Sequence, residues 1–267
     1  MPPLDPSVPS IQITQTAATM TVELHHPARA NALNDDMLEA LVDAMTSPPE
    51  GTRVAVLTGA GDRHFSAGLD LGTLTGQPLA DRLRQGESML GRAAQAIAEC
   101  SVPVIAAING AAFGGALELA LACDWRIGCD TAQFGMPAAR LGVVYAPSGL
   151  RRFAAVLGPG RVRQLFLTGR TIDATRAYEI GLIDQVIPAA KMGSVIDDEC
   201  AQIVRAAPGA VAGMRTALRA IDGALDASVT NEIEGIRQAA YASPEFMEGL
   251  TAFRERRAPR WSTQTTD

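Results

Sequence analysis

The sequence predicts an α/β fold with a helical C-terminal region, and three observations carry this prediction. Short, almost wholly apolar runs such as RVAVLTG (residues 53–59) and VPVIAAING (residues 102–110) are typical of strands in a sheet covered on both faces. A loop of small residues and then a stretch with helical spacing follow each run, so strands and helices alternate along the chain. From about Met192 onward, the apolar positions show helical spacing alone.

The N-terminal part is expected to form two strands and one helix. Residues 11–27 alternate between apolar and polar well enough for two short strands joined near residues 16–19. Asn34 is the expected N-cap of the first helix, because apolar residues then recur at helical spacing through Met37 and Leu41.

The middle of the chain repeats the order of strand, loop and helix. The strand at residues 53–59 precedes a polar loop and a long helix from about Pro78 to Cys100. The strand at residues 102–110 precedes a helix in GGALELALACD, and WRIGCD is expected to be the next strand. Glu87 and Glu99 lie on the long helix, and either could lean toward a pocket, although most helix glutamates are solvated.

We expect two parts in the chain, an α/β core at residues 1–191 and a helical region at residues 192–267. Ser243 and Pro244 form a good start for the last helix of this region. The apolar stripes of these helices must be buried on something, and a neighbouring subunit is one candidate.

Composition excludes several classes of partner. The 267 residues are 47% hydrophobic, which is ample for a large core, and the net charge of −6 argues against nucleic acid as a partner. No apolar run reaches the ~18 residues that span a bilayer, and no signal pattern begins the sequence, so we expect a cytoplasmic protein without a membrane partner. The four cysteines lack metal-like spacing and are expected to be free thiols; they are Cys100, Cys123, Cys129 and Cys200.

One stretch places a carboxylate inside an apolar helix. In NGAAFGGALELALACD (residues 109–124), Gly114 and Gly115 leave the backbone open where a helix begins. The first N–H groups of a helix lack internal acceptors and attract anions. Glu118 lies three residues after Gly115 on the same face, so an oxyanion donor and an acid/base group would lie side by side. The alternative is that the glycines allow close packing and that Glu118 pairs with an arginine.

A second small-residue loop favours the chemical interpretation. HFSAGLDL (residues 64–71) follows one buried strand as NGAAFGG follows another, and ligands of α/β folds usually bind at such strand ends. Two backbone N–H groups directed at one carbonyl oxygen would stabilise an enolate by several kcal/mol.

These motifs resemble those of the crotonase, or enoyl-CoA hydratase/isomerase, superfamily over nearly the whole chain. The motifs that carry the resemblance are HPARANALN, FSAGLDL, PVIAAINGAAFGGALELALACD, AQFGMP, LGVVYAPSG and LTGRTIDATRAYEIGLID. The resemblance implies a spiral of strand–strand–helix (ββα) units with a C-terminal helical trimerisation region. It also implies acyl-CoA thioester substrates, no cofactor beyond the coenzyme A of the substrate, and a homotrimer or a dimer of trimers.

The resemblance also implies roles for residues of the two loops. The amides of Ala67 and Gly115 are expected to donate the two oxyanion hydrogen bonds, with Gly114 beside them and Glu118 as the acid/base. The loop formed by Ala67, Gly68, Leu69 and Asp70 is expected to hold the adenine and pantetheine by backbone contacts.

Two arginines resemble basic residues that the family places near coenzyme A. Arg29, in HPARANALN, is expected near the phosphates of the bound coenzyme A. Arg256, in the C-terminal helix, resembles a basic residue that reaches the coenzyme A of an adjacent subunit.

The sequence departs from the family at one catalytic position. Hydratases of this family use two glutamates around one water; Glu118 matches the first, but Ala138 occupies the position of the second. Family isomerases rely mainly on that second position, so they fit even less well. With Ala138 there, we expect slow hydration of crotonyl-CoA, which Ala138→Glu should raise.

Tyr145 leaves a second reaction open. Its position in LGVVYAPSG resembles that of a tyrosine in methylmalonyl-CoA decarboxylase, a family member that carries a histidine where this chain has Leu69. A tyrosine hydroxyl with a pKa near ~10 is better suited to orienting a group than to removing a proton. The alternative for Tyr145 is a packing residue with its hydroxyl at the surface.

The expected function is therefore that of an enoyl-CoA hydratase-like lyase with Glu118 as its main acid/base. Two alternatives remain open, a decarboxylase of malonyl-type thioesters that uses Tyr145 and a catalytically weak acyl-CoA-binding protein.

Overall fold

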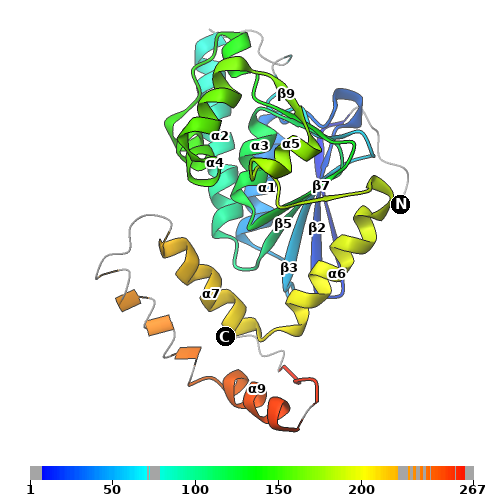
Figure 1. The fold of residues 1–267 in the computed structure, drawn as a ribbon, viewed down its shortest axis with the longest axis vertical. Helices are drawn as coiled ribbons and strands as arrows, with labels where there is room; N and C mark the ends of the chain where they lie inside the picture. Colours follow the sequence, from blue (N-terminus) through cyan, green and yellow to red (C-terminus); the bar gives the residue numbers. More distant parts are fainter. Residues whose placement is uncertain are drawn as a thin grey trace.

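The computed structural model describes residues 8–70, 72, 79–221, 228, 231–232, 235–236, 239–240, 242–255 and 257–261. Its α/β body is built around a six-stranded sheet, with a smaller four-stranded sheet beside it. Helices cover both faces of the larger sheet, and the C-terminal helices α7 and α9 extend from one end of the body (Figure 1).

The larger sheet has the order β1-β2-β3-β5-β7-β10. Only β1 and β2 are antiparallel, and every other neighbouring pair is parallel. The strands are β1 (Ser10–Thr16), β2 (Thr19–His25), β3 (Val54–Gly59), β5 (Val104–Ile108), β7 (Trp125–Cys129) and β10 (Gln185–Ile187). All five residues of β5 are buried, as expected for a strand covered on both faces. The predicted strands of this sheet are confirmed.

The smaller sheet has the order β4-β6-β8-β9 and was not predicted. Its strands are β4 (His64–Ser66), β6 (Ala111–Phe113), β8 (Gln133–Gly135) and β9 (Thr171–Asp173). Segments of three residues are too short to show an alternating pattern. Along the chain, β4, β6 and β8 each follow a strand of the larger sheet and precede a helix. This repetition is a spiral of ββα units, which confirms the predicted fold class.

The helices at residues 35–46, 79–99 and 115–122 begin where the sequence predicts them, whereas those at residues 147–168 and 174–179 were not predicted. The side chain of Asn34 accepts a hydrogen bond of 2.9 Å from the amide of Met37, which confirms Asn34 as an N-cap. The helix α4 is kinked at Gly158, whose φ of +74° is left-handed. The helices are α1 (Asp35–Thr46), α2 (Leu79–Glu99), α3 (Gly115–Ala122), α4 (Pro147–Thr168) and α5 (Ala174–Glu179), with short 3₁₀ turns η1 (Pro27–Arg29), η3 (Ala138–Leu141) and η4 (Ala189–Lys191).

The C-terminal helices are α6 (Met192–Arg205), α7 (Pro208–Ile221) and α9 (Pro244–Glu255). Ile196 and Cys200 of α6 pack on the face of the larger sheet formed by Val54, Val56 and Ile105. The hydroxyl of Ser243 accepts a hydrogen bond from the amide of Phe246, which confirms the predicted helix start. The stretch SVTNEIEGIRQAAY (residues 228–241), whose apolar spacing predicts a further helix, lies half outside the described residues, and the residues that are described there are helical.

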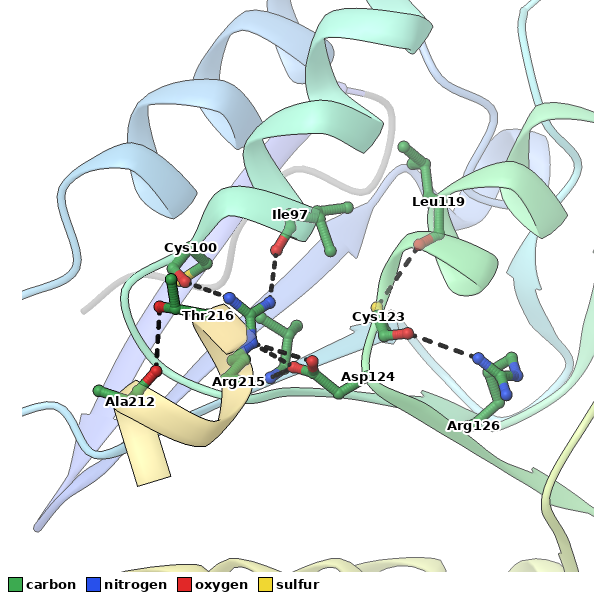
Figure 2. A network of polar contacts seen from close by, with 10 residues as sticks. Ile97, Cys100, Leu119, Cys123, Asp124, Arg126, Ala212, Arg215 and Thr216 are labelled. Atoms are coloured by element: carbon green, nitrogen blue, oxygen red, sulfur yellow. Dashed lines mark hydrogen bonds and ion pairs between the residues drawn. The ribbon is translucent and has the colours of Figure 1, made fainter. Parts of the chain in front are cut away.

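A buried arginine joins α7 to the body (Figure 2). The Nε of Arg215 donates to both carboxylate oxygens of Asp124, at 2.9 and 2.8 Å. Its other nitrogens donate to the carbonyl oxygens of Cys100 and, at 3.1 Å, of Ile97. A buried guanidinium with this many acceptors is costly to disturb, so Arg215 fixes α7 to the α/β body.

No helix in the described part of the chain is long and apolar enough to cross a membrane. The four cysteines are buried, and none of them forms a disulfide.

Candidate active site

Three loops meet at one edge of the smaller sheet, because β4, β6 and β8 are neighbours there. A hydrogen bond of 3.0 Å from the amide of Gly114 to the carbonyl oxygen of Gly135 joins two of the loops. Between them lies a cleft of about 550 Å³, its open mouth included. The residues that line it are Ala67, Leu69, Glu87, Leu90, Gly114, Gly115, Met136, Pro137, Ala138, Leu141, Val143 and Tyr145.

The loops that carry Gly68 and Gly115 approach each other closely. A methyl group on Gly68 would lie 2.6 Å from the carbonyl oxygen of Phe113 and 3.0 Å from the amide nitrogen of Gly115. Gly68 also has a φ of +86°, which favours glycine. The SAG and GG motifs therefore bring their backbones together, as their positions after neighbouring strands predict.

The assignment of Ala67 as an oxyanion donor is wrong. The Ala67 amide donates to the carbonyl oxygen of Ala30 at 2.9 Å, so it is not available to a ligand. The Gly68 amide donates to the hydroxyl of Ser66, and the Asp70 amide donates to the carbonyl oxygen of Leu33. The Leu69 amide has no acceptor among the described residues, and it is the free N–H group of this loop.

The amide of Gly115 remains available for the oxyanion role that the sequence predicts. It is the first residue of α3, and its amide has no acceptor within the part of the chain that is described. The preceding Gly114 has a φ of +55°, so only a residue without a side chain adopts this turn easily. The cleft thus contains two free amides, on Leu69 and Gly115, from two loops in contact.

Glu118 lies one turn into α3 and is buried, with 2% of its surface exposed. Within the described residues it forms no ion pair with an arginine. The hydroxyl of Tyr145 donates a hydrogen bond of 2.7 Å to the Oε2 atom of Glu118. The expected packing alternative for Tyr145, with its hydroxyl at the surface, is therefore wrong.

The ring of Tyr145 is held by aromatic contacts and by a glycine. It makes edge-to-face contacts with Phe153 and Phe166, at centroid distances of 6.3 and 5.4 Å. Gly149, one turn into α4, lies so close that a methyl group there would collide with the Tyr145 ring and lie 2.7 Å from Oε2 of Glu118. Glycine at this position is required for the contact between the two side chains.

Burial dominates the electrostatics of this pair. It raises the pKa of Glu118, while the hydrogen bond from Tyr145 and the charge of Arg152 lower it and the charge of Glu87 raises it. Burial, followed by the charge of Glu118, raises the pKa of Tyr145 well above its usual value. Glu118 is therefore the better proton acceptor and donor of the two near neutral pH.

Comparison with known proteins identifies the family. Residues 14–264 match the family model for enoyl-CoA hydratase/isomerase. The chain belongs to this family, which is the crotonase superfamily.

Individual relatives agree with this assignment over nearly their full length. The chain is 34% identical to a carnitinyl-CoA dehydratase of Salmonella arizonae over 94% of this chain and 98% of the relative. It is 33% identical to the carnitinyl-CoA dehydratase of Escherichia coli strain K12, with the same coverage of both chains, 94% and 98%. The crystal structure of an enoyl-CoA hydratase from Bacillus anthracis superimposes with a TM-score of 0.90 at 31% identity, covering 96% of this chain and 100% of that one.

An alanine, Ala138, stands at the position where the resemblance expects the second glutamate of family hydratases. Ala138 begins η3, is 7% exposed and lines the cleft beside Met136 and Pro137. This wall of the cleft is apolar and provides no acid or base.

The structure describes one of the two arginines that are expected near coenzyme A. The side chain of Arg29 is 49% exposed and lies 3.5 Å from the carboxylate of Asp70, at the outer end of the 67–70 loop. Arg256 lies outside the described residues.

The structure places at the site two residues without a predicted role, Gly149 and Arg152, and it also places there Glu87, which the sequence shows only as one of two helix glutamates. Gly149 gave no signal, because a glycine four residues after a tyrosine has no fixed meaning without the fold. For Glu87 a signal exists. It lies three residues before Leu90 on α2, so the two share a helix face, and Leu90 contacts Gly115.

Proposed function

We propose that this chain adds water to, and removes water from, the Cα–Cβ bond of acyl-CoA thioesters. One observation carries the proposal. A buried carboxylate, Glu118, is held by Tyr145, and Tyr145 lines an apolar cleft that also presents the free amides of Leu69 and Gly115. The relatives named carnitinyl-CoA dehydratase support this reaction type, because dehydration of a thioester is the reverse of the hydration proposed here.

The two free amides would bind the thioester oxygen. When water adds at Cβ, the electron pair of the double bond moves toward the carbonyl and an enolate oxygen forms. Two N–H groups that are already in position stabilise this charge without reorganisation, and loss of one such donor typically costs about 10²–10³-fold in rate.

Glu118 would exchange the proton of the water. In the hydration direction its carboxylate accepts a proton as the water oxygen bonds to Cβ. Burial raises the pKa of Glu118, which makes it a stronger base than an exposed carboxylate and lets it return the proton in the reverse reaction.

Tyr145 would position Glu118 and would not transfer a proton itself. Its hydroxyl hydrogen is already donated to Glu118, and its pKa is raised well above the usual value. This arrangement argues against the decarboxylase alternative, in which Tyr145 would donate to the carboxylate of a malonyl-type substrate. Such a carboxylate would also be repelled by the neighbouring Glu118.

We also propose that the loop of Gly68, Leu69 and Asp70 holds coenzyme A, with Arg29 near its phosphates and Arg256 reaching a neighbouring subunit. A trimer or dimer of trimers would bury the exposed apolar residues of the C-terminal helices, among them Met214 at 60%, Leu218 at 65% and Met247 at 59% exposure. Sedimentation at micromolar concentration should then show a trimer or hexamer, and a folded monomer would contradict this assembly.

The reaction can be tested with a panel of thioesters, namely crotonyl-, longer enoyl-, methylmalonyl- and aromatic acyl-CoA. We expect 3-hydroxyacyl-CoA from the enoyl esters, and we expect Glu118→Gln to lower turnover about 10²–10⁴-fold with little change in affinity. Release of CO₂ from methylmalonyl-CoA that falls in Tyr145→Phe would support the decarboxylase instead. Tight binding of the esters without any product would support a catalytically weak binding protein.

A complex with a non-reactive acyl-CoA tests the binding mode. The thioester oxygen should lie ~2.7–3.1 Å from the amide nitrogens of both Leu69 and Gly115. An oxygen bound to the Ala67 amide, with the Ala67–Ala30 hydrogen bond broken, would contradict the assignment.

A further inference from the structure

Hydration places the water oxygen on Cβ and a proton on Cα. Glu118 accepts a proton from water at Cβ, and Cα then takes its proton from Glu118 itself, from a second donor or from solvent. Ala138 has none to give, and the Tyr145 hydroxyl hydrogen is donated to Glu118. A second donor in the cleft would let the two steps proceed from two separate groups.

Glu87 enters the same cleft from a different element. It belongs to α2 and lines the cleft together with Leu69, Gly115, Ala138 and Tyr145. It also lines a second, more open hollow beside Ser88, Gly91, Arg92, Gln95, Ala146 and Ser148. Glu87 thus forms the wall between the cleft and this outer surface.

The contacts of neighbouring residues show which way the face of α2 that carries Glu87 points. A methyl group on Gly86 would lie 3.5 Å from Leu69, and one on Gly115 would lie 2.8 Å from Leu90. Glu87 lies between these contacts, one helical turn before Leu90. This face of α2 therefore lies across the two loops that carry the free amides.

Charge and burial also place Glu87 in the site. Its negative charge raises the pKa values of both Glu118 and Tyr145, so it lies within electrostatic reach of both. Glu87 has no hydrogen bond or ion pair with another described residue, which leaves its carboxyl group free to contact a ligand. Burial raises the pKa of Glu87, which favours the protonated form that a proton donor requires.

We propose that Glu87 is the second catalytic carboxyl group of this enzyme and gives Cα its proton. This inference rests on the proposed function. Glu118 accepts a proton from water while the water oxygen bonds to Cβ, and the electron pair of the double bond forms the enolate. The enolate pair then bonds to the proton of the Glu87 carboxylic acid at Cα. Glu118 is left protonated and Glu87 ionised, and proton exchange with solvent restores both.

The role of Glu87 can be tested with crotonyl-CoA and three variants of the whole protein, Glu87→Gln, Glu118→Gln and Glu99→Gln. We expect Glu87→Gln to lower kcat by about 10²-fold, the lower end for a positioned acid/base group, with little change in KM. Glu99 lies at the end of the same helix with 54% of its side chain exposed, so Glu99→Gln is the matched control and should keep wild-type kcat. Ala138 alone predicts slow hydration, because it cannot give a proton. If Glu87 gives the proton instead, hydration should be slow in Glu87→Gln and not in the wild type.

Chemical rescue separates proton transfer from a structural role. In Glu87→Ala, acetate should restore part of kcat in proportion to its concentration, because a small acid can occupy the vacated space. Acetate should not raise the kcat of Glu118→Gln, because the glutamine side chain fills the space of the glutamate that it replaces. Wild-type kcat in Glu87→Gln, a change confined to KM, or a loss that acetate does not restore would overturn the inference.

The outcomes also separate this inference from the proposed function. Hydration that disappears in Glu118→Gln but is unchanged in Glu87→Gln would overturn the role of Glu87 alone. A wild type that hydrates no enoyl ester would overturn both.

Discussion

Glu87 lines the cleft and Glu118 lies behind its lining residue Tyr145, so the two carboxyl groups have different surroundings. Glu118 is 2% exposed, receives a hydrogen bond from Tyr145 and lies against Gly149. Glu87 is half-buried at the wall of the cleft and has no hydrogen-bond partner among the described residues. One carboxylate is fixed by its neighbours, whereas the other keeps its rotamer freedom.

This difference indicates what each group can do. A fixed carboxylate is suited to placing a water at one point beside Cβ, because positioned groups lose little entropy during reaction. A carboxyl group with several rotamers can reach Cα after the substrate has bound. Turnover should therefore be sensitive to small changes in the packing around Glu118 and insensitive to such changes around Glu87.

Among changes to the packing that holds Glu118, the largest effect is expected from Gly149→Ala. The added methyl group would collide with the ring of Tyr145 and lie 2.7 Å from Oε2 of Glu118, so the two side chains must separate. We expect turnover to fall by about 10²-fold, as misplaced catalytic groups typically cause. Overpacking of this kind should also lower the free energy of unfolding by about 1–3 kcal/mol.

Gly160→Ala is the control for that variant. Gly160 lies on the same helix, and a methyl group there would have no atom within 4 Å. Its turnover and melting temperature should stay near wild type. Wild-type turnover in Gly149→Ala would show that Glu118 does not need to be held.

A smaller effect is expected from Tyr145→Phe. The variant removes the 2.7 Å hydrogen bond to Glu118 and keeps most of the ring packing. A hydrogen bond to a charged group is worth about 1.5–3 kcal/mol, so turnover should fall by about tenfold or somewhat more. Tyr178→Phe, at a tyrosine that is 56% exposed, should leave turnover unchanged.

The pH dependence of Tyr145→Phe gives a second readout. The hydroxyl of Tyr145 lowers the pKa of Glu118 because it donates to the ionised form. Its removal should raise that pKa, and the acidic limb of the kcat profile should move to higher pH. An acidic limb that stays in place or moves to lower pH would show that Glu118 is not the group that titrates.

The fold followed from the sequence more readily than the site did. Apolar runs such as residues 53–59 and the Asn34 cap gave the larger sheet and α1, because strand burial and capping are local signals. The GG motif before Glu118 gave the position of one free amide for the same reason.

Long-range pairing could not be predicted in this way. The choice between the Ala67 and Leu69 amides depends on the carbonyl oxygen of Ala30, which lies 37 residues earlier in the sequence than Ala67. The partner of Glu118 lies 27 residues away, in a loop without regular structure. The three-residue strands of the smaller sheet, which bring these loops together, are too short to show a period.

Glu118→Gln should change stability as well as activity. The pKa of Glu118 is raised in the folded state by burial, so the folded protein binds this proton more strongly than the unfolded chain does. The contribution of Glu118 to the free energy of unfolding is therefore present at low pH, and it is lost as the pH rises above the usual glutamate range. We expect Glu118→Gln to melt a few degrees above wild type at pH 8, and the difference should shrink toward pH 4. A variant that melts below wild type at pH 8 would mean that the ionised carboxylate stabilises the fold.

The smallest effect is expected from Ala138→Glu, and it bears most directly on the comparison of the two carboxylates. Ala138 lines the cleft, so a glutamate there would restore the group that family hydratases carry. In Glu87→Gln, which lacks the proposed proton donor, we expect this second change to recover kcat by a few-fold. In the wild type it should add little, because Glu87 already gives the proton and a third carboxylate beside Glu118 is repelled. Ala138→Gln in Glu87→Gln has the same size without the acid, and it should recover nothing. An equal gain from Ala138→Glu in both backgrounds would show that the second position is empty in the natural enzyme and that Glu87 does not fill it.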